Sequence, residues 1–203
     1  MTGRAVAVVG GGGLGREIRD YLADAGCDFA GFIDDNAAVA DRLGGVADAS
    51  TLDVDVLLGV GSVEARLSLI ARLGTGVTYV ALIHPTAVVS PSAQIGAGAL
   101  VGPFCMVGPG AQLGNHSILN VNCMIGHDGV LGDAAVVSPH VVLAGGSTIG
   151  AGCFLGSSSV IFQGVSVGAQ SVVSAGSMVS KDVPAESFVA GNPARSMPRQ
   201  RIA

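Results

Sequence analysis

Apolar positions in the C-terminal half of the chain recur every six residues. Counting in sixes from Ile83 to Val179 meets seventeen positions, and each of them is Val, Ile or Leu. The residue four places further on is Ala, Ser, Cys or Gly at fourteen of them, and Val at the other three. An α-helix, with a period of 3.6 residues, cannot keep a strict period of six on one face. The pattern predicts a coil of three short flat faces, each contributing one large and one small residue to a narrow interior.

Three such hexads make one coil of 18 residues, so residues 18 apart should stack about 4.8 Å apart, the spacing of neighbouring strands. Seventeen hexads predict between five and six coils. We expect the recurrent Gly after the aliphatic residue to serve a sharp turn of the backbone. Cys105, Cys123 and Cys153 all occupy the small interior position, where a thiol behaves as a small apolar group.

The N-terminal part follows a different pattern, in which short apolar runs alternate with amphipathic segments. This alternation predicts strands and helices in turn, and therefore a parallel sheet. We expect strands over 5–9, 28–33, 54–60 and 77–80, and helices over 16–25 and 63–73.

Charge divides the chain in the same way. Six of the ten Lys and Arg lie in residues 1–73, and residues 74–180 contain none. Such a shift in composition is typical of a domain boundary. We predict a small Rossmann-like domain over 1–80, a β-helix over 81–185, and a tail over 186–203 that caps the last coil.

Composition excludes several classes of protein. A hydrophobic fraction of 49% excludes a disordered chain, and a net charge of −5 argues against nucleic-acid binding. The mean hydropathy of +0.60 is high, yet no run of about 18 apolar residues predicts a spanning helix. The first residues lack the apolar core and cleavage site of a secretory signal. We therefore expect a soluble, cytoplasmic protein.

A glycine loop follows the first predicted strand. Its spacing, Gly10-x-Gly12-x-x-Gly15, matches the dinucleotide fingerprint, with Asp34 about 20 residues on. The unit is close to a single mononucleotide-binding half, and no domain for hydride transfer follows it. A mononucleotide or a nucleotide-sugar diphosphate therefore fits better than NAD, with its phosphates on the amides that open the first helix. Glycines that serve only a tight turn remain the alternative. The predicted substrate-binding residues are Gly10, Gly11, Gly12, Gly13, Leu14, Gly15, Asp34, Asp35 and Gly61.

Polar side chains are rare in the repeats but gather between Asn120 and Asp128. His127 and Asp128 are the third and fourth residues of their hexad, which places them on the outside of the coil. Residue 145, one coil further on, is a glycine within Ala144-Gly145-Gly146. This stacking predicts a histidine base beside a backbone N–H that could stabilise an oxyanion.

Six segments in this order resemble the NeuD/PglD-type sugar acetyltransferases, a family of hexapeptide-repeat acyltransferases. The segments are GGGGLGREI, FIDD, IHPTA, ILN followed by IGHD, LAGG and AGNPAR. The resemblance implies a left-handed parallel β-helix and an acetyl-CoA-dependent homotrimer. It also implies a nucleotide-sugar on the α/β domain and CoA in the cleft between neighbouring β-helices.

The resemblance also implies roles for single residues. His127 corresponds to the general base, Asp128 to the carboxylate that orients it, Asn120 to a polar residue near the acceptor, and Gly145 to the oxyanion amide. Some members carry histidines where this chain has Leu14 and Val136. We expect His140 to be a possible substitute, His84 to lie at the domain junction, and His116 to occupy an exposed corner.

The phosphates of CoA find no cation within the repeats. We therefore expect them on backbone amides at Gly145 and Gly146 and on Lys181 and Arg195, with Arg199 and Arg201 close by in the tail. The expected reaction is direct N-acetylation of a nucleotide-linked amino sugar, without a metal or an acyl-enzyme.

Three alternatives stay open at this stage: O-acetylation of a sialic-acid-like sugar, a non-catalytic nucleotide-sugar-binding protein, and a carbonic anhydrase that shares the β-helix. The last requires three histidines that converge on a metal. His116, His127 and His140 do not show the usual close spacing of two such ligands.

Overall fold

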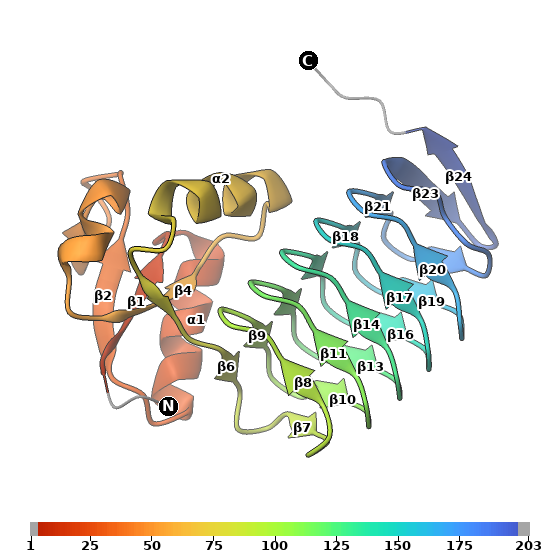
Figure 1. Ribbon diagram of the computed structural model, residues 1–203, viewed down its shortest axis with the longest axis horizontal. Helices are drawn as coiled ribbons and strands as arrows, with labels where there is room; N and C mark the ends of the chain where they lie inside the picture. The colour runs from red at the N-terminus through yellow and green to blue at the C-terminus, as the bar shows by residue number, and fades with distance from the viewer. Residues whose placement is uncertain (1–3, 199–203) are drawn as a thin grey trace.

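The computed structural model describes residues 4–198, in which a small α/β domain lies beside the N-terminal coils of a long β-helix (Figure 1). The α/β domain is a five-stranded parallel sheet in the order β3-β2-β1-β4-β5. Its elements are β1 (Val6–Val9), α1 (Gly13–Asp24), β2 (Phe29–Ile33), β3 (Arg42–Gly44), the 3₁₀ helix η1 (Val46–Thr51), β4 (Asp55–Leu58), α2 (Val63–Leu73) and β5 (Thr78–Tyr79).

The predicted strands and helices of this domain are all present, with shifted ends. Helix α1 begins at Gly13, three residues before the predicted start, while α2 has the predicted bounds. Two elements were not predicted, namely β3 and η1. Strand β3 is only three residues long and lies at the edge of the sheet, so its apolar signal is weak.

The β-helix consists of two-residue strands that form three parallel sheets, which we call its first, second and third faces. The first face holds β6 (Leu82–Ile83), β9 (Leu100–Val101), β12 (Ile118–Leu119), β15 (Val136–Val137), β18 (Phe154–Leu155) and β21 (Val172–Val173). The second holds β7 (Val88–Val89), β10 (Met106–Val107), β13 (Met124–Ile125), β16 (Val142–Leu143), β19 (Val160–Ile161) and β22 (Met178–Val179). The third holds β8 (Gln94–Ile95), β11 (Gln112–Leu113), β14 (Val130–Leu131), β17 (Thr148–Ile149) and β20 (Ser166–Val167).

Strand pairing confirms the 18-residue register of the coils. Met106 pairs with Met124, for example, and Ile125 with Leu143. The second residue of each strand points inward, and those from Val101 onward are fully buried in one continuous core. The three interior cysteines are buried in the same core, and each thiol contacts a backbone carbonyl of the next coil, as Cys105 Sγ does with Asn120 O at 2.8 Å.

The recurrent glycines serve a purpose other than the expected turn. The residues between two consecutive strands form a corner of the coil. Left-handed backbone occurs at the third corner residue, for example at Asp128 with a φ of 56° and at His140 with a φ of 62°. The first corner residue, directly after a strand, is often Gly because neighbouring coils approach closely there. A Cβ on Gly108, for example, would lie 2.7 Å from the backbone nitrogen of His127. Asn120 has this first corner position, where Gly is frequent, and it has no positive φ, so its backbone is not strained.

The α/β domain covers the first face. Leu100, Ile118 and Val136 point outward from that face and pack in one apolar cluster with Ile18 and Leu22 of α1. Burial of these side chains on both partners fixes the domain against the early coils.

A hairpin closes the far end of the β-helix (Figure 1). It consists of β23 (Ser187–Gly191), which pairs with β21, and antiparallel β24 (Ala194–Pro198). Arg199 and Arg201 lie outside the described residues. Within residues 4–198, neither helix has the length and apolar character that crossing a membrane requires.

Candidate functional site

His127 and Asp128 form a hydrogen-bonded pair on the corner between the second and third faces. His127 Nδ1 lies 2.9 Å from Asp128 Oδ2, and the two side chains are 60% and 74% exposed. Asp128 is held in left-handed backbone and its amide donates to Pro109 O of the preceding coil. With Nδ1 bonded to the carboxylate, the second ring nitrogen, Nε2, remains available for chemistry.

The imidazole of His127 lies directly against Gly145, one coil further on. A Cβ built on residue 145 would lie 2.3 Å from Nε2 and 2.7 Å from Cε1 of that ring. The coils are joined at this point because the Gly146 amide donates to His127 O at 2.8 Å. The ring can adopt this position only because residue 145 has no side chain.

The amide of Gly145 is available as a hydrogen-bond donor. Within residues 4–198, no backbone or side-chain atom accepts a hydrogen bond from it. The structure therefore brings together an imidazole, a carboxylate and a free N–H, which is the arrangement that the spacing of His127 and Gly145 predicts. Such a set can remove a proton and stabilise an oxyanion next to it.

Asn120 does not join this group within one chain. It lies on the corner between the first and second faces, so that strand β13 separates it from His127. Its Oδ1 accepts a hydrogen bond from the Val121 amide at 2.7 Å. Exposed His140 lies on the same corner as Asn120, in the next coil.

The glycine loop leaves the N-terminus of α1 open. Gly12 is the N-cap residue and the first turn contains no acidic side chain. A Cβ on Gly12 or Gly13 would meet nothing within 4 Å, so this side of the loop faces open space. Gly15 has a packing role instead, because its Cβ would lie 1.9 Å from Gly10 O. The free amides and the helix dipole make this end of α1 suitable for an anion.

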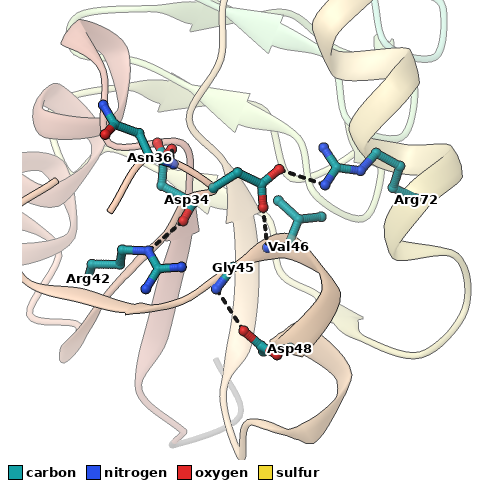
Figure 2. Close-up of polar contacts among 8 residues, drawn as sticks. Asp34, Asn36, Arg42, Gly45, Val46, Asp48 and Arg72 are labelled. Carbon is teal, nitrogen blue, oxygen red and sulfur yellow. Dashed lines mark hydrogen bonds and ion pairs between the residues drawn. The ribbon is translucent and has the colours of Figure 1, made fainter. Parts of the chain in front are cut away.

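Both predicted aspartates are used to shape the loops around this helix end. Asp34 accepts from the Gly11 amide through Oδ2 and from the Asn36 amide through Oδ1, both at 2.8 Å. Asp34 thereby ties the glycine loop to the end of β2. Figure 2 shows the neighbouring contacts, including that of Arg42 Nε with Asp34 O at 2.6 Å.

Asp35 accepts from the Val46 amide at 2.9 Å and forms an ion pair with Arg72 at 2.6 Å. The Val46 amide, and after it the Arg72 guanidinium, hold the pKa of Asp35 below its usual value. This carboxylate joins the 3₁₀ helix η1 to α2, so it contributes from an exposed position to the shape of the sheet edge beside the glycine loop.

Gly61 and Leu14 lie side by side at this edge, since a Cβ on Gly61 would be 3.8 Å from Leu14 Cδ2. Val39 was not among the predicted residues, yet its Cγ1 would lie 2.3 Å from a Cβ on Gly11 and so covers the loop. The sequence carries no local signal for this contact, because the segment around Val39 shows no periodicity.

The two predicted cations lie on different elements. Lys181 is exposed on the same corner as His127 and three coils further on, which corresponds to about 14 Å at the spacing of strands. Arg195 is exposed on β24, opposite Ala190 of β23. Among the described residues, no group of three or more His, Cys, Asp or Glu side chains could hold a metal ion.

Two other histidines lie where the α/β domain meets the β-helix. His84 is buried, with Nε2 3.1 Å from Asp24 Oδ2 and Nδ1 2.8 Å from Thr86 Oγ1. The expectation of an exposed corner for His116 is wrong. Its ring packs edge-on against Tyr79, and its Nδ1 is buried without a hydrogen-bond partner among the described residues. Burial, and then the charge of Arg66, lower the pKa of His116.

Family models match three segments of the chain. The PglD N-terminal domain matches residues 5–73, the bacterial transferase hexapeptide model of six repeats matches 92–127, and the hexapeptide repeat of succinyl-transferase matches 147–181. A curated relative, UDP-N-acetylbacillosamine N-acetyltransferase of Bacillus subtilis, is 37% identical over 107 residues. That alignment covers 46% of this chain and about half (49%) of the relative.

Solved structures resemble the chain over nearly its whole length. The acetyltransferase domain of PglB from Neisseria gonorrhoeae is 31% identical, with a TM-score of 0.89 over 96% of this chain and 100% of that one. Perosamine N-acetyltransferase PerB from Caulobacter crescentus, solved with CoA and GDP-perosamine, is 30% identical, with a TM-score of 0.90 over 95% and 97% of the two chains. These likenesses confirm the predicted fold class, a small Rossmann-like domain followed by a left-handed parallel β-helix.

Proposed function

We propose a function from the premise that this chain belongs to the NeuD/PglD-type family of hexapeptide-repeat sugar acetyltransferases. The chain transfers the acetyl group of acetyl-CoA directly to the amino group of a nucleotide-linked sugar. One observation carries the proposal, namely that the imidazole of His127 lies against the bare backbone of Gly145 and beside its free amide.

In this reaction the acceptor amine attacks the thioester carbonyl while Nε2 of His127 removes its proton. Asp128 accepts the hydrogen bond from Nδ1–H, which selects the tautomer and stabilises the imidazolium. The N–H of Gly145 donates to the oxyanion of the tetrahedral intermediate. The C–N bond forms, the C–S bond breaks, and the proton held by His127 passes to the departing CoA thiolate.

The acceptor binds to the α/β domain in this proposal. The open N-terminus of α1 at Gly12 and Gly13 takes the diphosphate, and Asp34 keeps Gly11 and its neighbours in the binding conformation. The solved complex of PerB with CoA and GDP-perosamine supports this class of acceptor.

The donor runs along the corner that carries His127. Gly145 and Gly146 leave room next to the base, and Phe162, 42% exposed in the following coil, offers an apolar contact to the pantetheine arm. Lys181 lies about 14 Å from His127 on this corner, a span that suits the diphosphate of CoA, and Arg195 would add a second charge from the hairpin.

A homotrimer completes the proposal, with the second face as the contact surface. The outward residues of this face are all apolar, namely Val88, Met106, Met124, Val142, Val160 and Met178. Four of the five on the third face are polar, namely Gln94, Gln112, Thr148 and Ser166, with Val130 between them. Val88 is 69% exposed and Met106 43% exposed in one chain, so association would cover them.

The trimer also accounts for Asn120. Because Asn120 and His127 lie on opposite edges of the second face, packing this face against another copy brings the Asn120 corner of one chain towards the His127 corner of the next. Met106→Lys places a charge in this surface and should give monomers in sedimentation experiments. Gln112→Lys, the equivalent change on the third face, should leave the oligomeric state as it is.

His127→Ala tests the catalytic assignment. With acetyl-CoA and a panel containing GDP-perosamine and UDP-linked amino sugars, we expect kcat to fall by about 10²–10⁴-fold, measured as thiol release and acetylated product. CoA binding, measured by calorimetry, should be retained, and Gln112→Ala serves as the control. A wild-type rate in His127→Ala would refute the assignment.

The product distinguishes the remaining alternatives. An amide resists hydroxylamine, whereas the ester of an O-acetyltransferase is cleaved, so the mass after hydroxylamine treatment separates the two. A non-catalytic sugar-binding protein would be stabilised by the nucleotide-sugar and release no thiol. We expect the reaction to take place in the cytoplasm.

A further inference from the structure

Arg66 of α2 is a charged side chain in an unusual place. Its exposed fraction is 0%, and among residues 4–198 no carboxylate forms an ion pair with it. Burial lowers its pKa to about 10, so it remains a cation at neutral pH. A buried charge without a counter-ion is tolerated only where its hydrogen bonds are satisfied.

Backbone carbonyls of two domains satisfy these hydrogen bonds. Nη1 donates to Leu58 O at 3.2 Å and to Val60 O at 2.7 Å, at the carboxyl end of β4. Nε and Nη2 both donate to His116 O of the β-helix, at 3.1 and 2.7 Å. A single planar guanidinium therefore joins the loop after β4 to a corner of the β-helix.

The loop held by Arg66 supports the glycine loop. Gly59 lies between the two carbonyls that Arg66 binds, and its Cβ would be 2.7 Å from Gly10 O and 2.8 Å from Gly15 Cα. Because these three glycines are in direct backbone contact, a shift of the loop after β4 moves the N-terminus of α1 as well.

His116, on the β-helix side of the joint, is also held by several contacts. His116 has a φ of 57°, its amide donates to Ala97 O, and its ring centroid lies 4.4 Å from that of Tyr79. A Cβ on Gly98 would be 2.4 Å from His116 Nδ1, so the ring packs closely against the neighbouring coil. The carbonyl that Arg66 binds is thus held in place from three sides.

We propose that Arg66 is a positioning residue. By fixing the α/β domain against the β-helix, it determines how far a nucleotide-linked acceptor bound at the glycine loop extends towards His127. This inference rests on the proposed function. The diphosphate fixes one end of the acceptor at α1, so the position of the reacting amine depends on how the two domains are joined. A displacement of about 1 Å at the reacting atoms can cost about 10²-fold in rate.

The test compares two acceptors in Arg66→Lys. Lysine keeps the charge but cannot reach carbonyls on both sides, because an ammonium lacks the planar fork. We expect kcat/KM to fall at least about tenfold for the nucleotide-linked amino sugar and to stay within about twofold for the same sugar without its nucleotide. Arg19→Lys, an exposed arginine on α1, is the matched control. Equal losses with the two acceptors, or no loss with either, would overturn the proposal.

A second readout does not depend on activity. In Arg66→Lys, hydrogen exchange should become faster at residues 58–66 and at 114–118 together, and remain unchanged at 148–156 in the centre of the β-helix. If only one of the two segments responds, Arg66 does not couple the domains and the proposal is wrong. If the wild-type protein acetylates neither acceptor while both segments respond, the joint stands and the proposed function fails.

Discussion

Gly145→Ala separates the geometry of the base from the stability of the fold. The backbone at this position accepts a side chain, since Gly145 does not have a positive φ and the equivalent corner positions hold Ala151 and Ala169. The obstacle is the imidazole of His127, whose Nε2 would lie 2.3 Å from the new methyl carbon. The substitution therefore acts on the proposed base and leaves the Gly145 amide in place.

The magnitude follows from the size of this overlap. The ring must move by roughly 1 Å to reach an ordinary contact, and because it is 60% exposed it can do so by rotating into solvent. The rotation breaks its 2.9 Å bond to Asp128 and moves Nε2 away from the amide. We expect a loss of about 10²-fold in kcat, and a change in the free energy of unfolding within about 0.5 kcal/mol.

A double-mutant cycle gives the cleanest assay. Gly145→Ala is measured in the wild-type protein and in His127→Ala, with thiol release from acetyl-CoA and thermal unfolding as the two readouts. In the absence of the ring the alanine has nothing to displace, so kcat of the double variant should equal that of His127→Ala. Ala151→Gly, which deletes a side chain at an equivalent corner, controls for a general effect of corner substitutions.

Two results would refute this reasoning. Gly145→Ala with full activity would mean that the ring does not lie over residue 145 during catalysis. A further loss in the double variant, comparable to that in the wild type, would mean that alanine acts on the amide or on CoA and not on the base.

Asp34→Ala removes the acceptor of the Gly11 amide and should weaken nucleotide binding about 10–100-fold in calorimetry, consistent with the loss of one charge-assisted bond; unchanged affinity would contradict the role given to Asp34. Truncation after Pro184 removes β23 and β24 and should lower CoA affinity and solubility together; intact CoA affinity would count against the tail. The pKa of His116 lies below its ordinary 6.5, so the unfolded state binds more protons and stability should fall as pH drops below 6.5. His116→Asn should flatten this fall in thermal unfolding, and an unaltered pH profile would contradict it.

The period of six in the sequence was sufficient to predict the β-helix and the stacking of His127 on Gly145. The register of the stacked strands is fixed because successive side chains point alternately to the interior and to the surface. A slip of one residue would expose every Val, Ile and Leu of the interior. The same count in steps of 18 relates any residue to its neighbours in the next coils. This is why the base and the amide could be paired from the sequence alone.

Contacts between the domains were not accessible to this reasoning. The position of a residue on a corner predicts that its side chain points outward, but it does not predict which element packs over it. In the structure, α2 covers His116. Arg66 did carry a signal, because Val63, Arg66, Ile70 and Leu73 share one stripe of α2 at helical spacing. A lone arginine within an apolar stripe predicts burial, and the carbonyls that it binds come from distant parts of the chain.

The exposure of His127 and Asp128 gives the proposed trimer a second role. Two unit charges 4 Å apart interact with about 1 kcal/mol in water and about 4 kcal/mol near a protein surface of lower effective dielectric constant. His127 and Asp128, 60% and 74% exposed in one chain, are close to the first case. Stabilisation of an imidazolium by Asp128, and of an oxyanion by Gly145, becomes large only when water is excluded from this corner. The apolar second face ends at the same corner, so the association that covers Val88 and Met106 would also cover the pair, together with the bound CoA. We therefore expect assembly and catalysis to be coupled through the dielectric environment of one exposed turn.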